Sequence, residues 1–211
     1  MSRVIDQLVE KYPDLSGCQQ DVKRAFLAMK ESYTAGGKLL VCGNGGSASD
    51  SEHIVGELMK GFMSKRTLPA AERQRFVDEL GEEGGALADL LQGGLPAISL
   101  TSHAALISAV ANDTDAAMVY AQQVYGYGKQ GDVLLGLSTS GNSKNVLQAL
   151  RVARVQGLTT IGLTGQSGGE MKSLCDICIC VPYVQTPDVQ ERHLPIYHAL
   201  CLALEEALFQ P

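Results

Sequence analysis

Tryptophan is absent from this sequence of 211 residues, and aromatic residues make up only 5% of it. A hydrophobic core must therefore be built mainly from Ala, Leu, Val and Ile, which supply most of the 45% of hydrophobic residues. This composition is typical of helices that pack closely on a parallel sheet. The length suffices for one domain whose core needs no disulfide bonds.

An excess of positive charge is also lacking, since the formal net charge is −6. Nucleic-acid binding requires a basic stripe that neutralises phosphates, and the sequence has none. The chain opens without a charged-then-apolar leader, and no apolar run approaches the about 20 residues of a membrane-spanning helix. We therefore expect a cytoplasmic protein that binds neither nucleic acid nor membranes.

Zinc-finger spacing is missing as well, although the chain has six cysteines. The run Cys175-x-x-Cys178-x-Cys180 can indicate a metal or redox site. However, residues 176–181 are typical of a buried strand in which cysteine serves as a small apolar residue, and no second pair of Cys or His ligands follows at the required spacing. A structural role for these cysteines is therefore the favoured interpretation.

A strand, a polar loop and a helix start follow one another in residues 132–146, DVLLGLSTSGNSKNV. Residues 133–137 have the length and apolarity of a strand buried on both faces, and helical periodicity begins at Asn145. The loop thus precedes a helix N-terminus, whose unpaired N–H groups and partial positive charge favour an anion. Gly141 lets the backbone approach a ligand closely. Hydroxyl groups add further donors, from Ser138, Thr139, Ser140 and Ser143.

A second loop of small residues, 43–49, follows an apolar strand at residues 38–42. Either loop alone could be a polar connection with a good helix cap. Two such loops can instead converge on one ligand, because α/β folds bind ligands at the carboxyl ends of their strands. Neither loop has the Gly-Lys-Ser/Thr ending of a Walker A motif or the Gly-x-Gly-x-x-Gly order of a dinucleotide site. We therefore expect a small phosphate-bearing ligand, bound by loop geometry.

His53 and Glu57 lie four residues apart in the helix predicted after the second loop, so both project from one face and can act on one point. His53 alone would more often be a surface or capping histidine. With a carboxylate one turn later, an active-site role becomes an equal alternative. On the predicted terminal helix, Gln190 and His198 lie about 80° apart around the axis and so share a broad face.

The remaining sequence predicts a single domain of strands and helices. Two helices, at residues 2–11 and at 16–36 with Ser16 as N-cap, exceed what the sheet needs, and a neighbouring subunit is the natural cover for their apolar faces. Residues 64–93 predict one or two inserted surface helices with a solvated charged face. Further strands are predicted at residues 97–100, 159–164 and 176–181, and the other helices at 48–62, 103–110, 116–127, 142–156, 170–174 and 187–209.

Together these motifs resemble the sugar isomerase (SIS) domain and, within it, the phosphoheptose isomerases, which convert sedoheptulose 7-phosphate to D-glycero-D-manno-heptose 7-phosphate. The resemblance covers nearly the whole chain and implies a single SIS domain over residues 1–211. It is carried, in this order, by VCGNGGSA at 41–48, the helix with His53 and Glu57, AND at 111–113, GDVLLGLSTSGNS at 131–143, LTG at 163–165, and TPDVQE at 186–191 followed by His198.

The resemblance implies a three-layer, doubly wound (flavodoxin-like) α/β fold with a five-stranded parallel sheet flanked by helices. It also implies a homotetramer with active sites at subunit interfaces, which would place the helices of residues 1–36 in an interface. The family's catalytic base falls on Glu57 and its partner acid on His198. Several members bind zinc, one ion per subunit, through the positions of His53, Glu57, Gln190 and His198. Substrate-binding positions of the family fall on Asn44, Gly45, Gly46, Ser47, Asn112, Asp113, Ser138, Thr139, Ser140, Ser143 and Gln190.

Two departures from the family pattern concern the sugar specificity. The insertion at 64–93 is longer than the family's usual link, and a family arginine four residues after the base falls on Gly61. A positive charge for the substrate would then come from Lys60, Lys65 or Arg66. Two alternative functions stay open: a non-catalytic DiaA-type protein, which shares the loops but binds the bacterial replication initiator and lacks the acid and base, and another phosphosugar enzyme of the SIS group.

Overall fold

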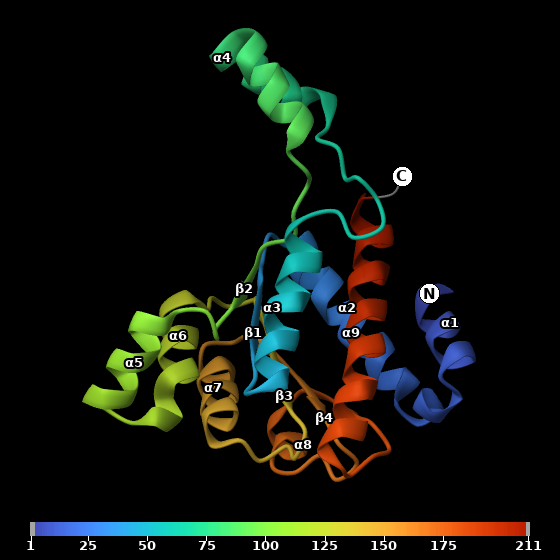
Figure 1. The fold of residues 1–211 in the computed structure, drawn as a ribbon, viewed down its shortest axis with the longest axis vertical. Helices are drawn as coiled ribbons and strands as arrows, with labels where there is room; N and C mark the ends of the chain where they lie inside the picture. Colours follow the sequence, from blue (N-terminus) through green and yellow to red (C-terminus); the bar gives the residue numbers. More distant parts are fainter. Residues whose placement is uncertain (1–2, 210–211) are drawn as a thin grey trace.

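The sheet at the centre of the fold has five parallel strands in the computed structural model, which describes residues 3–209 (Figure 1). These strands are β1 (Leu39–Cys42), β2 (Ala97–Ser99), β3 (Val133–Ser138), β4 (Thr159–Thr164) and β5 (Ile177–Cys180). Their order in the sheet, β2-β1-β3-β4-β5, is the flavodoxin-like doubly wound order. One row of paired residues crosses the whole sheet, from Ser99 through Val41, Leu135 and Ile161 to Ile177. The predicted fold class is confirmed.

Helices cover both faces of the sheet, because side chains alternate along each strand and both sets are apolar. Leu39 and Val41 enter one layer of the core, and Leu40 and Cys42 enter the other. The first layer contains α1 (Arg3–Lys11), α2 (Gln19–Thr34), α3 (Gly46–Met59) and α9 (Thr186–Phe209), with the short η1 (Pro13–Cys18). The second contains α6 (Val119–Tyr127), α7 (Lys144–Val155) and α8 (Met171–Leu174), with α5 (Ala104–Asp113) and η2 (Ala116–Met118) beside α6.

The two N-terminal helices bury their apolar faces within this chain. Ile5 and Leu8 of α1 and Val22 of α2 belong to the core cluster that includes α9. Apolar faces alone are therefore no reason for a neighbouring subunit, and the interface role of residues 1–36 stays a prediction, with residues 1–2 outside the described part. The prediction of Ser16 as an N-cap is wrong, since Ser16 lies inside η1 and α2 begins at Gln19.

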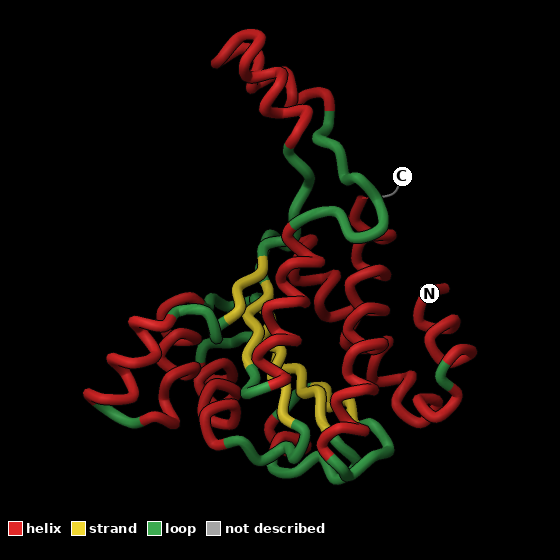
Figure 2. The backbone as a smooth tube through the Cα atoms, viewed as in Figure 1, coloured by secondary structure: helices red, strands yellow, loops and turns green. Residues whose placement is uncertain are grey.

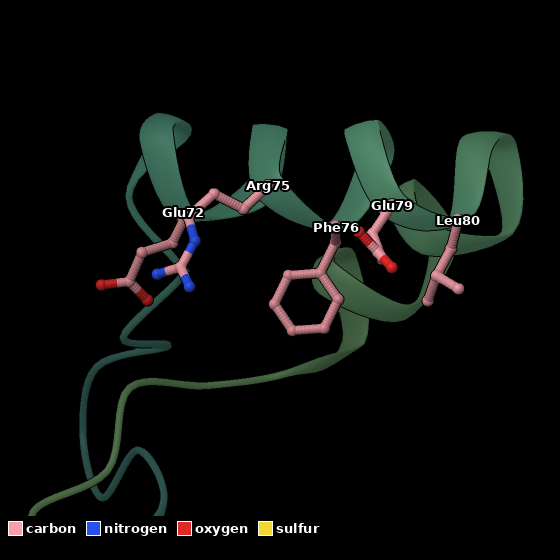
Figure 3. A pocket seen from close by; sticks show the side chains of 5 residues that line it. All are labelled: Glu72, Arg75, Phe76, Glu79 and Leu80. Atoms are coloured by element: carbon pink, nitrogen blue, oxygen red, sulfur yellow. The ribbon is translucent and has the colours of Figure 1, made fainter.

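The insertion forms a helical hairpin that projects from the body of the molecule (Figures 1 and 2). Its helix α4 (Ala70–Leu90) contains Gly81 with φ 63° and ψ −141°, which breaks it into two helices. Within α4, all of which the structure describes, only Gly84, Gly85 and Ala88 are buried. Figure 3 shows the shallow groove along its first helix, lined by Glu72, Arg75, Phe76, Glu79 and Leu80. The predicted surface helices with solvated charges are confirmed.

A buried carboxylate anchors the root of the hairpin to the body. Glu205 of α9 accepts hydrogen bonds from the backbone N–H groups of Phe62 at 2.8 Å, Met63 at 2.9 Å and Ser64 at 3.2 Å. Arg66 donates its Nε–H to Glu205 at 2.7 Å, and both side chains are almost fully buried. The start of the insertion is thus held against the terminal helix. Among residues 3–209, no helix has the length and apolarity needed to cross a membrane.

Candidate functional site

The two loops singled out in the sequence meet at one pocket of about 300 Å³. They follow β1 and β3, neighbouring strands at which the order of the doubly wound sheet reverses. Such a switch point is where α/β folds bind ligands. The pocket is lined by Asn44, Gly45, Gly46, Ser47, Leu137, Ser138, Thr139, Ser143, Thr186 and Gln190. The predicted convergence of the loops is therefore what the structure shows.

Three helix N-termini border this pocket. Gly46 and Ser47 open α3, Ser143 precedes the first residue of α7, and Thr186 opens α9. Each N-terminus offers unpaired N–H groups and a partial positive charge, so the pocket favours an anion although the protein is negative. The hydroxyl groups of Ser138 and Ser143 lie 2.9 Å apart. Backbone and side-chain hydrogen-bond donors are therefore close enough together to bind one phosphate group.

Two residues that sequence reasoning missed hold the loops together. The side-chain amides of Asn44 and Asn145 pair reciprocally, at 2.9 and 2.8 Å. Tyr120 of α6 donates its hydroxyl to the carbonyl of Gly43 at 2.6 Å. Asn145 stands in the first turn of α7, a position at which the sequence indicates only the start of a helix. Tyr120 carries no signal in the sequence, because its loop partner lies 77 residues away.

Three predicted substrate-binding residues lie outside the lining of this pocket. Ser140 is exposed and accepts from the N–H of Asn142 at 3.2 Å within its own loop. Asn112 and Asp113 are exposed at the end of α5, where the Asn112 amide donates to the Asp113 carboxylate at 2.8 Å. Helix α5 itself is rich in apolar residues, yet in the described chain none of its residues is buried.

His53, Glu57 and His198 lie together, between α3 and α9. His53 Nε2 is 3.1 Å from Glu57 Oε1, and the rings of His53 and His198 have centroids 5.0 Å apart. Phe62 and Tyr197 pack on the ring of His198 at 5.4 and 5.1 Å between centroids. The candidate acid and base are therefore neighbours although 141 positions separate them in sequence, as their numbers show.

The pocket and the acid–base pair lie at two levels along the same two helices. Helices α3 and α9 run side by side and both start at the pocket (Figure 1). Glu57 follows Gly46 by eleven residues, and His198 follows Gln190 by eight, which is about two to three helical turns in each case. Gln190 lies at the pocket end, where its amide packs so closely against Gly46 that a side chain at residue 46 would displace it. The lining of the pocket includes neither Glu57 nor His198, and His198 instead lines a separate pocket of about 250 Å³ against α1.

Burial affects the pKa of His198. It lowers the pKa of His198 below the usual histidine value, and the neighbouring His53 lowers it further, while Glu57 acts in the opposite direction. The neutral form of His198 is therefore favoured relative to a free histidine. Among the described residues, neither Glu57 Oε2 nor His198 Nε2 has a hydrogen-bond partner, although both atoms are buried. Unpaired buried acceptors of this kind are costly unless a ligand or ion supplies the missing partner.

The donor set suits a zinc ion in its chemistry, with two imidazoles, a carboxylate and an amide oxygen. The unpaired Glu57 and His198 atoms fit this too. In the part of the chain that the structure describes, however, no three His, Cys, Asp or Glu side chains stand in a ready-made metal-binding group. Gln190 lines the pocket end of α9, away from the two histidines along the helix.

Three residues could supply the positive charge of the missing family arginine, and they differ in exposure and contacts. Arg66 is committed to the buried pair with Glu205 and also donates to the Leu58 carbonyl at 2.7 Å. Lys65 is exposed. Lys60 is exposed as well, and its Nζ lies 3.8 Å from Glu57 Oε2. Of these three cations Lys60 lies beside the candidate base.

Comparison with known proteins points in one direction. The SIS domain family matches residues 74–165. The phosphoheptose isomerase of Rhodospirillum rubrum is 38% identical over 194 residues, which cover 92% of this chain and 89% of the relative. Phosphoheptose isomerase 2 of Campylobacter jejuni is 39% identical over 89% of this chain and 81% of its own length.

Solved structures agree. A phosphoheptose isomerase from Francisella tularensis superposes with a TM-score of 0.76 at 31% identity, over 93% of this chain and 91% of that one. Phosphoheptose isomerase GmhA from Neisseria gonorrhoeae gives a TM-score of 0.71 at 30% identity, over 96% and 97%. The similarity therefore extends over the whole fold, beyond the loops that carry the motifs.

Proposed function

The chain belongs to the phosphoheptose isomerases, a family of SIS-domain proteins, and we propose on that premise that it converts sedoheptulose 7-phosphate to D-glycero-D-manno-heptose 7-phosphate. One observation carries the proposal: an anion pocket and an acid–base pair lie at successive levels of α3 and α9. The substrate has its phosphate at one end and its reacting carbons at the other. The two levels match these two ends.

The phosphate is held at the pocket. The hydroxyl groups of Ser138, Thr139 and Ser143 donate to its oxygens, together with N–H groups at the helix N-termini. Asn44 and Ser47 contact the sugar from the other loop. Because the pocket's charge is local, it binds a phosphate in a protein whose formal net charge is −6.

The reaction moves a proton between adjacent carbons through an enediol, so it needs a base at carbon and an acid at oxygen. Glu57 takes the proton from C1 of the ketose and returns it to C2. His198 serves the oxygens as a neutral imidazole, the form that polarises a carbonyl without a full charge.

We also propose one zinc ion per subunit, held by His53, Glu57, Gln190 and His198. Its support is the donor chemistry and the unpaired buried atoms of Glu57 and His198. When bound, zinc would act as a Lewis acid that polarises the substrate carbonyl. Glu57 would then have to leave the ion to act as base.

A cytoplasmic homotetramer is the remaining part of the proposal. Helix α5 has an apolar sequence with no buried residue in the described chain, and Asn112 and Asp113 at its end lie outside the chain's own pocket. A site that includes this pair would take it from a neighbouring subunit. Both features favour assembly, in which the helices of residues 1–36 and α5 provide the contacts.

The rival DiaA-type function needs only the fold and the loops. The presence of Glu57 and His198, and their closeness to His53, favours the isomerase. Incubation with sedoheptulose 7-phosphate, followed by NMR of the sugar, separates the two functions: the isomerase yields the aldose, whereas a binding protein leaves the ketose unchanged. Pentose and hexose phosphates in parallel incubations report the sugar specificity that Gly61 leaves open.

A further inference from the structure

Two contacts of the Tyr197 hydroxyl link α9 to α3 behind the acid–base pair, and a third contact lies within α3. The Tyr197 hydroxyl lies 3.1 Å from Asp50 Oδ1 and 3.1 Å from His53 Nδ1. The second ring nitrogen of His53, Nε2, lies 3.1 Å from Glu57 Oε1. We infer that Asp50 and Tyr197 are positioning residues, which fix the tautomer of His53 so that its Nε2 lone pair and Glu57 share a divalent cation. This inference rests on the zinc site of the proposed function.

Donor and acceptor capacity assigns the protons in this chain of bonds. An ionised Asp50 accepts only, so Tyr197 donates its one hydroxyl hydrogen to it. Tyr197 must then accept from His53, which places the ring hydrogen on Nδ1. A neutral imidazole protonated at Nδ1 carries a lone pair on Nε2. Metal-ligating histidines usually donate their other ring N–H to such a partner.

The separation of the two acceptors matches a common metal ion. Zinc lies about 2.0–2.1 Å from an imidazole nitrogen or carboxylate oxygen, and two ligands at a tetrahedral angle are then about 3.3 Å apart. His53 Nε2 and Glu57 Oε1 are 3.1 Å apart. Without a proton between them these two acceptors repel each other, whereas a shared cation stabilises both.

Unpaired atoms close to His53 also support a shared cation. Glu57 Oε2 and His198 Nε2 are buried acceptors without a partner among the described residues. His53 lies beside both residues, and Lys60 Nζ lies 3.8 Å from Glu57 Oε2. In the described chain these three side chains do not form a ready-made metal-binding group, so the inference places the shared cation on His53 and Glu57. Tyr197 directly precedes His198 in α9. The residue that orients His53 is therefore the chain neighbour of His198, the other histidine of the proposed site.

Packing alone explains the ring of Tyr197 but not its hydroxyl. The ring is 1% exposed and meets the rings of His53 and His198 edge-on. A phenylalanine would fill the same space. The hydroxyl is the part of the side chain that can hydrogen-bond Asp50 and His53, so its removal isolates the positioning role.

The test compares Tyr197→Phe with wild type and with Tyr183→Phe. Tyr183 also donates to an aspartate, Asp14 at 3.0 Å, but lies outside the site and serves as the matched control. Zinc is titrated against a competing chelator, and nitrogen-15 NMR of the histidine rings identifies the His53 tautomer in metal-free protein. We expect Nδ1–H in wild type and the control, a shift to Nε2–H in Tyr197→Phe, and zinc affinity about 10–100-fold weaker in that variant.

Asp50→Asn supplies a second variant, which keeps the shape and removes the charge that orients Tyr197. Circular dichroism checks that each variant is folded. An unchanged tautomer together with unchanged zinc affinity in Tyr197→Phe would overturn the inference, as would Nε2–H in wild type. If wild type binds no zinc, the proposed metal site fails, and the NMR comparison still decides whether Tyr197 sets the tautomer.

Discussion

Replacing Glu205 by Gln should weaken the contacts that hold the root of the hairpin to α9 and destabilise the protein strongly. Glu205 accepts three backbone N–H groups and pairs with Arg66, and both side chains are almost fully buried. Gln keeps the shape but loses the charge, and it turns an NH2 group toward a set of donors. Arg66 would remain buried without its counter-ion, a change that typically costs about 3–5 kcal/mol.

Urea unfolding followed by circular dichroism measures this loss. The matched control is Glu170→Gln, which breaks the exposed ion pair with Arg151 at 3.0 Å, a kind of pair worth about 0–1 kcal/mol. We also expect faster proteolysis between residues 62 and 94 in Glu205→Gln. A loss below about 1 kcal/mol, equal to that of the control, would refute the view that this buried pair anchors the insertion.

Three further predictions concern the phosphate pocket, the pH dependence and the assembly. Ser138→Ala and Ser143→Ala should each weaken sedoheptulose 7-phosphate binding about 10–100-fold in calorimetry, since a hydrogen bond to a charged group contributes about 1.5–3 kcal/mol. Wild-type affinity in both variants would show that the loop is not part of the site. Burial lowers the pKa of His193 to about 4, so the unfolded chain binds a proton between pH 6.5 and about 4 that the folded chain does not. Stability should fall by about 3 kcal/mol as the pH drops through this window, and His193→Gln should lose that slope in urea unfolding at pH 7 and 5. Light scattering should give a homotetramer, and a monomer at micromolar concentration would contradict both the assembly and a site shared between subunits.

The sheet was predictable because its strands are short apolar runs bounded by turn residues. The predicted strand at residues 159–164 coincides with β4, and β1, β2 and β5 differ by one or two residues at their ends. The start of α2 was less accessible to prediction. Pro13 opens an additional 3-10 helix there, and a serine at 16 mimics a cap without acting as one.

The loops of the site could be predicted because the carboxyl ends of neighbouring parallel strands meet. Pairings between distant elements could not. Tyr197 and Asp50 are 147 residues apart, and their bond depends on how α3 and α9 pack. Likewise, nothing in the sequence around Arg66 indicates that it pairs with Glu205 and is therefore unavailable to bind the substrate. Residues of this kind follow from the tertiary structure alone.

Proton exchange at C1 of sedoheptulose 7-phosphate in deuterated water tests the central claim most directly, because it reports the base without requiring product. Wild type should exchange the C1 proton, and Glu57→Gln should slow exchange and turnover about 10²–10⁴-fold while still binding the substrate. Glu52→Gln is the control on the same helix, since its carboxylate bonds to Ser102 at 2.9 Å, outside the site, and it should exchange like wild type. Exchange by Glu57→Gln at the wild-type rate, or no exchange by wild type that binds the sugar phosphate, would contradict the account.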